Sequence, residues 1–256
     1  VEKLELLDAL TEADSKATGP SAWNSWKEEL VDELVSRTKH VLGGGHASEI
    51  TWRLFPDEAT LALMAAGETA FSRDGDVITV VSPDSQGTFS QVAGVLSLHG
   101  LDVVTARSYS GEQGMAASQF RVSTAGELNW RSIRSDLGKA LDYELAIDAR
   151  LAERANTYRR RRHMQAETPG PPKVKFIEGG SSNATVIEVK AVTKIGILHR
   201  ITKALAELGL DIRHATVQTV GVEVVDTFYV RTRSGGLVTK NTHRKEIQKA
   251  LLHAVA

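Results

Sequence analysis

The sequence predicts an α+β fold made of two consecutive copies of a βαββαβ unit, preceded by a short all-helical segment. The main observation is a pattern that occurs twice. Gly87 is followed by helically spaced apolar residues and then by Gly100-Leu101-Asp102-Val103, and Gly196 is followed in the same way by Gly209-Leu210-Asp211-Ile212. Both pairs of glycines are separated by 109 residues. A duplicated unit of this length indicates two similar domains in one chain.

The elements of the first copy follow from its apolar periodicity. The β-branched run Val77–Val81 predicts a buried strand, which Ser82-Pro83-Asp84 stops. Phe89, Val92, Leu96 and His99 recur at steps of three and four and predict a helix that ends at Gly100. The remaining elements are a hairpin of 101–110 and 115–123, a helix carrying Trp130, Ile133, Leu137 and Leu141, and a last strand over Tyr143–Ile147. This order is that of the ferredoxin-like sandwich.

The second copy repeats the order with one change. Its predicted elements are a strand at Thr185–Val189, a helix opened by Gly196, a hairpin of 211–220 and 224–232, and a helix with Ile247, Leu251 and Ala254. Ser118–Val122 of the first copy matches Asp226–Val230 of the second at an offset of 108 residues. No strand is predicted after the last helix. We expect Lys173–Ile177 to supply the edge strand instead, through a hairpin across the loop 178–183.

The segments outside the two copies complete the expected organisation. Arg159-Arg160-Arg161-Arg162 belongs either to an exposed helix or to a linker, and the run Pro169-Gly170-Pro171-Pro172 marks a boundary. Phe55-Pro56-Asp57-Glu58 predicts a helix with proline in its first turn. The expected domains are a helical tail at 1–43, a helical connector at 44–72, the first copy at 73–150, a basic and Pro/Gly linker at 151–172, and the second copy at 173–256.

The composition excludes several classes of function. With 31 basic and 32 acidic residues the chain has no overall charge to attract nucleic acid or an anionic membrane. It contains no cysteine, which excludes disulfides and thiol nucleophiles and is compatible with a cytoplasmic location. No apolar run approaches the roughly 20 residues that span a bilayer. The chain begins at Val1 within a helical pattern, so we expect it to be a fragment of a longer protein.

The candidate ligand-binding segments are the turns between the first strand and first helix of each copy. Such turns present unpaired backbone N–H groups at the positive end of a helix, which suits the carboxylate of a small ligand. For the first copy the alternative is structural, with Asp84 as an N-cap and Gly87 as a tight turn. Asp102 and Asp211 either accept hydrogen bonds from the ligand or cap the following strand. The candidate residues are Asp84, Ser85, Gln86, Gly87, Thr88, Asp102, Val103, Thr193, Lys194, Ile195, Gly196, Ile197, Leu198, Asp211 and Ile212.

No catalytic constellation accompanies these turns. His199, Arg200 and His214 are typical of surface or hydrogen-bonded core residues, and no histidine pair has the spacing of a metal site. The chain also lacks a phosphate-binding glycine loop of the Walker type. The repeats therefore indicate binding modules without a cofactor of their own.

The motif residues resemble the ACT domain. Asp84-x-x-Gly87 before a helix and Gly100-Leu101-Asp102-Val103 after it are similar to this ferredoxin-like module, and so is Val225-Asp226-Thr227-Phe228-Tyr229-Val230 in the second copy. The resemblance implies amino-acid binding between paired copies, within or between chains. The second copy departs from the pattern, because Thr193 stands where an acidic residue is expected and Ile195 where proline is common.

The N-terminal segment resembles the end of the HD hydrolase domain of PII uridylyltransferase/uridylyl-removing enzymes. The similar residues are Leu6–Ser15, the break Gly19-Pro20, and Trp23–Lys27 with Leu30 and Leu34. The resemblance implies a regulatory, glutamine-sensing region of an enzyme that acts on the PII protein and uses a divalent metal elsewhere. Asp14 would match the last metal ligand of an incomplete HD site, so the fragment itself is expected to be non-catalytic.

Three alternatives stay open at the level of sequence. The parent enzyme transfers either UMP or AMP, since the residues that choose lie outside this chain. A free-standing amino-acid-binding protein with two ACT repeats, without catalytic domains, is the second reading. A nucleic-acid adaptor acting through Arg159–Arg162 is the third, and strong salt dependence of binding would indicate it.

Overall fold

The computed structural model describes residues 2–18, 31, 34–35, 38–39, 42–43, 55–111, 113–123, 126–161, 170–179, 181, 183–220 and 222–256. The chain divides into two compact units, Val1–Leu54 and Phe55–Ala256. In the first unit, helix α1 (Glu2–Thr18) includes Leu6–Ser15 and lies within the segment that was expected to be helical. Trp23–Lys27 and the break Gly19-Pro20 lie outside the described residues.

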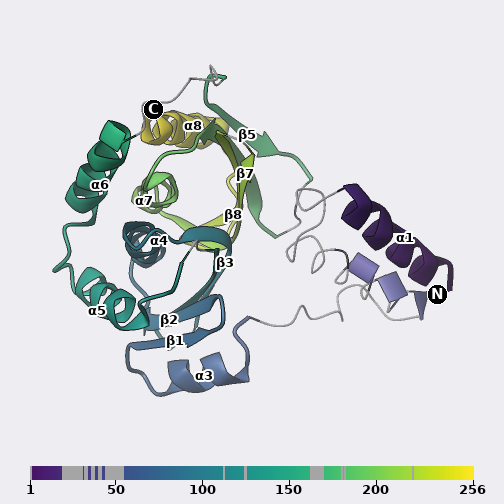
Figure 1. The fold of residues 1–256 in the computed structure, drawn as a ribbon, viewed down its shortest axis with the longest axis horizontal. Coiled ribbons are helices and arrows are strands. Elements are labelled where there is room, and N and C mark those ends of the chain that lie inside the picture. Colours follow the sequence, from purple (N-terminus) through teal and green to yellow (C-terminus); the bar gives the residue numbers. More distant parts are fainter. Residues whose placement is uncertain are drawn as a thin grey trace. The chain divides into compact units, whose positions relative to one another are not determined.

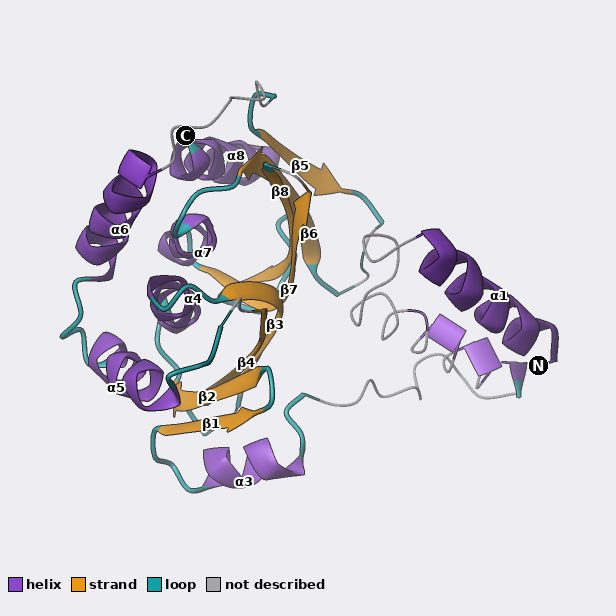
Figure 2. Cartoon of the chain, in the orientation of Figure 1, coloured by secondary structure: helices purple, strands orange, loops and turns teal. Residues whose placement is uncertain are grey.

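The second unit is built on one antiparallel sheet of eight strands in the order β1-β2-β4-β3-β7-β8-β6-β5 (Figures 1 and 2). The two copies join edge to edge, because β3 pairs with β7 through Thr105–Thr216, Ala106–Ala215 and Arg107–His214. The strands are β1 (Ala70–Asp74), β2 (Val77–Pro83), β3 (Asp102–Ser110), β4 (Met115–Ser123), β5 (Lys173–Ile177), β6 (Thr185–Val192), β7 (Leu210–Val220) and β8 (Glu223–Thr232). Pairing within the chain thus brings the duplicated units into a single layer.

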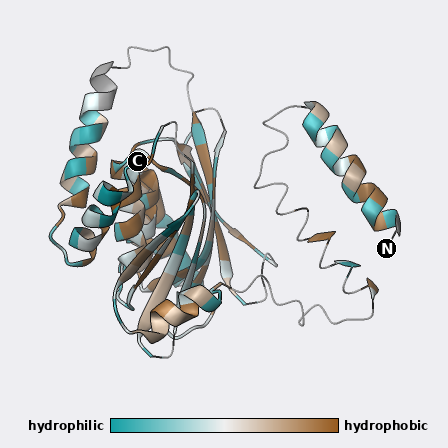
Figure 3. Cartoon of the chain, turned by 60° about the horizontal axis from the view of Figure 1, so that its bottom comes forward, coloured by the Kyte–Doolittle hydropathy of each residue, from teal (hydrophilic) through white to brown (hydrophobic). Residues whose placement is uncertain are grey.

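Five helices of this unit lie on one face of the sheet (Figure 3). They share a single apolar core with the strands, in which Phe120 and Phe228 are fully buried at corresponding places in the two copies. The helices are α4 (Thr88–Leu98), α5 (Trp130–Leu141), α6 (Ile147–Arg161), α7 (Ile197–Glu207) and α8 (Asn241–Val255). The predicted α+β class and its duplicated unit are therefore confirmed.

Helix α3 (Glu58–Ala65) packs on the opposite face of the sheet. Its Met64 contacts Val81 of β2 together with Met115 and Ala117 of β4, and side chains alternate between faces along a strand, so this cluster is separate from the main core. The N-cap is Asp57, whose carboxylate accepts a hydrogen bond from the Thr60 N–H at 2.8 Å. Proline was expected in the first turn of this helix, but Pro56 precedes the cap.

The predicted edge strand of the second copy is confirmed. Strand β5 pairs antiparallel with β6, and Val174 lies opposite Val189. Val174 is buried, and the Arg244 guanidinium lies 5.2 Å from the centre of the Phe176 ring. The edge strand therefore contributes side chains to the core as well as backbone hydrogen bonds.

The predicted fourth strand of the first copy, Tyr143–Ile147, is wrong. Helix α5 ends in a turn in which Tyr143 takes a φ of 60° and Glu144 N–H donates to the Lys139 carbonyl at 2.7 Å. The chain then enters α6 at Ile147, and the edge position is taken by β1, which pairs with β2. Both copies are thus rearranged in the same way, with the edge strand at the N-terminal end of the unit.

The basic segment was expected to be either a helix or a linker, and as far as Arg161 it is helical. The helix runs through Arg161, so the arginine run continues it instead of opening a linker. Arg162 and Pro169 lie outside the described residues. Among the described residues, no helix is long and apolar enough to cross a membrane.

Candidate ligand site

The two glycine turns occupy equivalent places in the fold. Gly87 precedes α4 with a φ of 91°, and Gly196 precedes α7 with a φ of 75°. Both values lie in the left-handed region, where glycine carries no steric penalty. Neither helix has a side-chain hydrogen bond at its N-cap. The structural alternative for Asp84 is therefore wrong, because the N-cap is Gly87 and not the aspartate.

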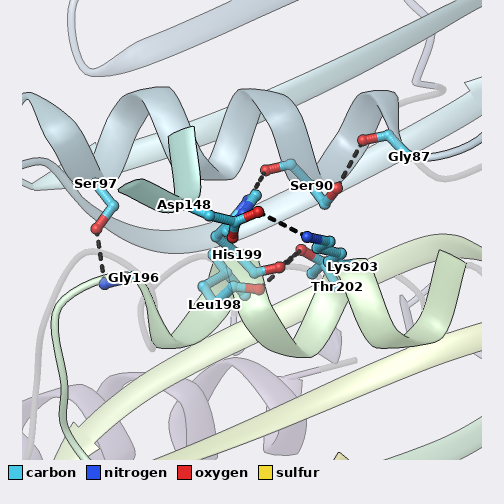
Figure 4. A network of polar contacts seen from close by, with 9 residues as sticks. All are labelled: Gly87, Ser90, Ser97, Asp148, Gly196, Leu198, His199, Thr202 and Lys203. Atoms are coloured by element: carbon cyan, nitrogen blue, oxygen red, sulfur yellow. Dashed lines mark hydrogen bonds and ion pairs between the residues drawn. The ribbon is translucent and has the colours of Figure 1, made fainter. Parts of the chain in front are cut away.

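Helices α4 and α7 cross at equivalent residues. His199 Nδ1 lies 2.7 Å from the carbonyl oxygen of Ser90, and these two positions are separated by the repeat offset of 109 residues (Figure 4). This approximate two-fold relation places each glycine turn opposite the C-terminal end of the other helix. A ligand in either turn would thus lie between the two copies.

The first turn is exposed and faces charged residues of the second copy. Asp84, Ser85 and Gln86 are exposed and Gly87 is half-buried. The carboxamide of Gln86 donates to the Ala206 carbonyl oxygen of α7, and its oxygen accepts a hydrogen bond from Arg233 Nη2 at 3.0 Å. Ser85 and Thr88 hydroxyls lie 2.8 Å apart and hold the turn together.

The charges around the first turn are mixed. Partial burial, and then the neighbouring Asp84 carboxylate, raise the pKa of Asp211, whereas the guanidinium groups of Arg213 and Arg233 oppose this shift. Burial, and then the neighbouring Arg231, lower the pKa of Arg213, whose guanidinium lies 5.9 Å from the centre of the Tyr109 ring. The carboxylates of Asp84 and Asp211 and the guanidinium groups of Arg213, Arg231 and Arg233 are therefore close enough to influence one another where the two copies meet. Such a cluster complements a ligand that carries both an ammonium and a carboxylate group.

The second turn is closed. Gly196 is buried, and its N–H donates to the Ser97 hydroxyl of α4 at 3.0 Å (Figure 4). A Cβ atom at Gly196 would lie 2.9 Å from Leu151 Cδ1 of α6. Lys194 Nζ donates to the Val255 carbonyl oxygen at 3.1 Å. Gly196 is thus covered by side chains of the same chain, whereas Thr193 and Lys194 are exposed.

The structure separates the predicted site residues into two groups. The exposed polar groups of the first turn meet Asp211 across the copies. The apolar members pack in the shared core instead, each less than a tenth exposed: Val103, Ile197, Leu198 and Ile212. Thr88 is also buried, and Asp102 is exposed at the start of β3. Ile195 packs against the edge of the core.

Sequence reasoning missed Arg233, which donates to Gln86 in the first turn, and Arg213, whose charge acts on Asp84 and Asp211. Arg213 lies at a bulge in β7, between Ile212 and His214. The equivalent bulge in β3 contains Val104. The two copies differ at this position, with arginine in the second and valine in the first. This difference could have indicated from the sequence that the first turn is the charged one.

His199 is a hydrogen-bonded core residue, as expected from the sequence. Its Nε2 lies 3.0 Å from Asp148 Oδ1, and Lys203 Nζ donates to the other oxygen of Asp148 at 2.7 Å. Burial opposes ionisation of Asp148, but hydrogen bonds from Lys203 and His199 outweigh it and lower the pKa of this carboxyl. The network joins α6 to α7, and through Ser90 to α4.

The structure also bears on the metal expected at Asp14. Asp14 is exposed on α1. No group of three or more His, Cys, Asp or Glu residues that could hold a metal ion occurs within the part of the chain that the structure describes. A single exposed carboxylate does not fit a catalytic metal, so no chemistry is assigned to Asp14.

Paired ferredoxin-like units with glycine turns between them define a small regulatory module of the ACT class. Residues 185–249 match the ACT domain family, so the second copy is an ACT domain. The chain is 37% identical to the bifunctional uridylyltransferase/uridylyl-removing enzyme of Streptomyces coelicolor, over 91% of this chain and 34% of that protein. It is 34% identical to the enzyme of the same description from Mycobacterium tuberculosis strain H37Rv, over 89% of this chain and 30% of that protein.

A more distant relative extends the match to the whole chain. The bifunctional uridylyltransferase/uridylyl-removing enzyme of Azospirillum brasilense is 29% identical over 100% of this chain and 33% of its own length. The chain thus spans about a third of the length of the relatives it matches. The resemblance to uridylyltransferase/uridylyl-removing enzymes that the sequence indicated is confirmed.

Proposed function

We propose that this chain is the regulatory region of a bifunctional nucleotidyltransferase/nucleotidyl-removing enzyme that modifies the PII protein in nitrogen control. In this proposal it senses glutamine at the first glycine turn. The observation that carries the proposal is the cluster of Asp84, Asp211, Arg213 and Arg233 where the two copies meet. The similarity to uridylyltransferase/uridylyl-removing enzymes over almost the whole chain supports the identity of the parent.

The cluster offers a complement for each charged group of an amino acid. The ammonium group would bind the carboxylates of Asp84 and Asp211. The carboxylate would bind Arg213 or the N–H groups at the start of α4, where the helix dipole favours an anion. A side-chain carboxamide carries donors and an acceptor, so it can bind backbone groups such as those that Gln86 already uses at Ala206.

The proposed ligand site lies between the two copies, which gives ligand binding a way to regulate an enzyme. Asp84 belongs to the first copy, and Asp211 and Arg213 belong to the second. A ligand that binds both halves stabilises the paired arrangement relative to any other, and a ligand shifts an equilibrium only through such a difference. Catalysis and its divalent metal would belong to other parts of the parent protein.

The alternative is a free-standing amino-acid-binding protein with two ACT repeats. It shares the ligand site but has no catalytic domain. The full-length reading frame distinguishes the two, because a nucleotidyltransferase domain in the same frame would exclude the alternative.

L-glutamine is expected to stabilise the chain against heat, and L-glutamate is expected to do so much less. Glutamine at about 100 times its dissociation constant adds about 2.7 kcal/mol to the free energy of unfolding. The Arg213→Ala variant should lose this stabilisation. Val104→Ala changes the equivalent bulge of the first copy and is the matched control, which should keep it. Differential scanning calorimetry with and without each amino acid measures the effect, and no shift with millimolar glutamine would refute the proposed ligand.

A further inference from the structure

The second glycine turn, Thr193–Gly196, has lost the opening that the first turn keeps. Gly87 is half-buried, and a Cβ atom added to it would meet only Ser90 Oγ at 3.7 Å. Gly196 is buried, and a Cβ atom there would lie 2.9 Å from Leu151 Cδ1. The two turns begin equivalent helices, so their own backbone geometry does not explain the difference. The difference comes from what covers them.

The first covering group is the hydroxyl of Ser97. It accepts a hydrogen bond from the Gly196 N–H at 3.0 Å, and this is one of the backbone donors that an anionic ligand of the turn would use. The repeat offset of 109 residues places Ala206 opposite Gly87 in the same way. Alanine has no hydroxyl, so the Gly87 N–H has no equivalent acceptor on the facing helix.

The second covering group is Leu151, which helix α6 holds over Gly196. Leu151 is only 5% exposed. Arg154 fixes the helix to the C-terminal end of α4 by donating to the Leu98 carbonyl oxygen at 2.7 Å. Asp148 fixes it to α7 through His199 and Lys203. Among the described residues, no atom of α6 lies within 4 Å of a Cβ atom added at Gly87, so this helix covers Gly196 and leaves Gly87 uncovered.

We propose that Leu151 of α6 and the Ser97 hydroxyl take the place of a ligand at the second turn. The chain therefore binds a single amino acid, at the first turn. Leu151 fills the space above Gly196, and Ser97 takes its N–H. The charges agree with this assignment. Arg213 stands at the bulge of β7, where its charge acts on Asp84 and Asp211, whereas Val104 stands at the equivalent bulge of β3. In the second turn Thr193 stands in place of the acidic Asp84. The choice of ligand in the experiment rests on the proposed function, but the closure of the second turn does not.

The ligand-independent test is amide hydrogen exchange of the whole chain followed by ¹⁵N NMR. In the wild type the Gly196 N–H should exchange several-fold more slowly than the Gly87 N–H. Ser97→Ala and Leu151→Ala should each speed up exchange at Gly196. Ser90→Ala, which removes the hydroxyl that donates to the Gly87 carbonyl at 2.8 Å, is the matched control and should leave Gly196 unchanged. Equal exchange at both glycines in the folded wild type would overturn the proposal.

The ligand-dependent test is calorimetric titration with L-glutamine. We expect one molecule per chain, with binding abolished by Asp84→Ala and kept by Thr193→Ala, two exposed positions that the repeat makes equivalent. Two molecules per chain, or loss of binding in Thr193→Ala alone, would overturn the single-site proposal. Absence of glutamine binding in the wild type would refute the proposed function instead, and hydrogen exchange would still decide whether the second turn is closed.

Discussion

Replacing Asp226 by Asn is expected to raise the free energy of unfolding at pH 8 by several kcal/mol and to leave it almost unchanged at pH 4. Asp226 lies on β8 with no exposed surface, and neither carboxylate oxygen makes a hydrogen bond of good geometry among the described residues; the backbone N–H of Gln218 acts on the carboxyl only weakly and does not offset its burial. Burial raises the pKa of this carboxyl to about 7 from its ordinary value of 3.8. Ionisation of an unpaired carboxylate in the core is therefore costly in the folded state.

The sign of the pH dependence follows from this raised pKa. The folded state binds the proton more tightly than the unfolded state, so the contribution of Asp226 to stability is fully present below about pH 4 and is lost as pH rises to about 7. The loss is about 1.4 kcal/mol per pH unit across this window, or roughly 4 kcal/mol in total. Above pH 7 the penalty stays constant, and Asn, which is never charged, avoids it.

Chemical denaturation at several pH values, with variant and wild type side by side, measures the effect. The comparison is needed because burial also lowers the pKa of His214 to about 4, which makes the wild type lose stability as pH falls through about 6.5 to 4. The His214 contribution is the same in the variant and the wild type, so it cancels when their free energies of unfolding are subtracted. Asp226→Ser is a matched second variant, since Ser118 stands at the equivalent position of the first copy. If the variant and the wild type differ in free energy of unfolding by the same amount at pH 4 and pH 8, the Asp226 carboxyl titrates normally.

The second large effect is expected at Gly94, in the middle of α4. A Cβ atom there would lie 2.5 Å from Ile147 Cγ2 and 2.8 Å from His199 Nδ1. Neither neighbour moves easily, because Ile147 is buried and His199 is held by Ser90 and Asp148. Gly94→Ala should therefore destabilise the protein by about 1–3 kcal/mol through overpacking, in spite of the better helix propensity of alanine.

Gly138 in α5 provides the control for Gly94. Nothing lies within 4 Å of a Cβ atom added at Gly138. Gly138→Ala should thus raise the free energy of unfolding by about 0.5–1 kcal/mol through helix propensity alone. Urea denaturation of both variants measures the contrast. Equal stabilisation by the two substitutions would contradict the close approach of α4, α6 and α7.

The sequence predicted elements whose signal lies within a few residues. Helical spacing from Phe89 to Leu96 and the hairpin of Lys173–Ile177 with the following strand are local patterns, and the structure confirms both. Tyr143–Ile147 was misread because Leu145 and Ile147 are apolar at a spacing of two, which is typical of a strand. Both side chains are buried, but the chain there leads into a helix. Strand β1 gave little signal, since three of its five residues are exposed.

In the candidate site, too, local patterns could be predicted from the sequence and contacts between distant segments could not. The glycine turns could be predicted because duplication makes them visible in the sequence. The difference between the turns could not, because it depends on contacts between distant segments. Leu151 reaches Gly196 from another element, and Ser97 is 99 residues away from its partner. Only the relative placement of α4, α6 and α7 brings these groups together.

The position of the edge strands has a consequence for how the connection between the copies can change. In each copy the edge strand precedes the other three, so each sheet half is complete before α5 or α8 begins. Residues 142–161, which follow α5, therefore take no part in strand pairing. Their contacts lie in the helical layer, where Leu151 covers Gly196 and where Asp148 and Arg154 hold α6 to α7 and α4. A tandem protein of this design can thus switch a second site on or off by altering its connector, while both sheet halves stay intact.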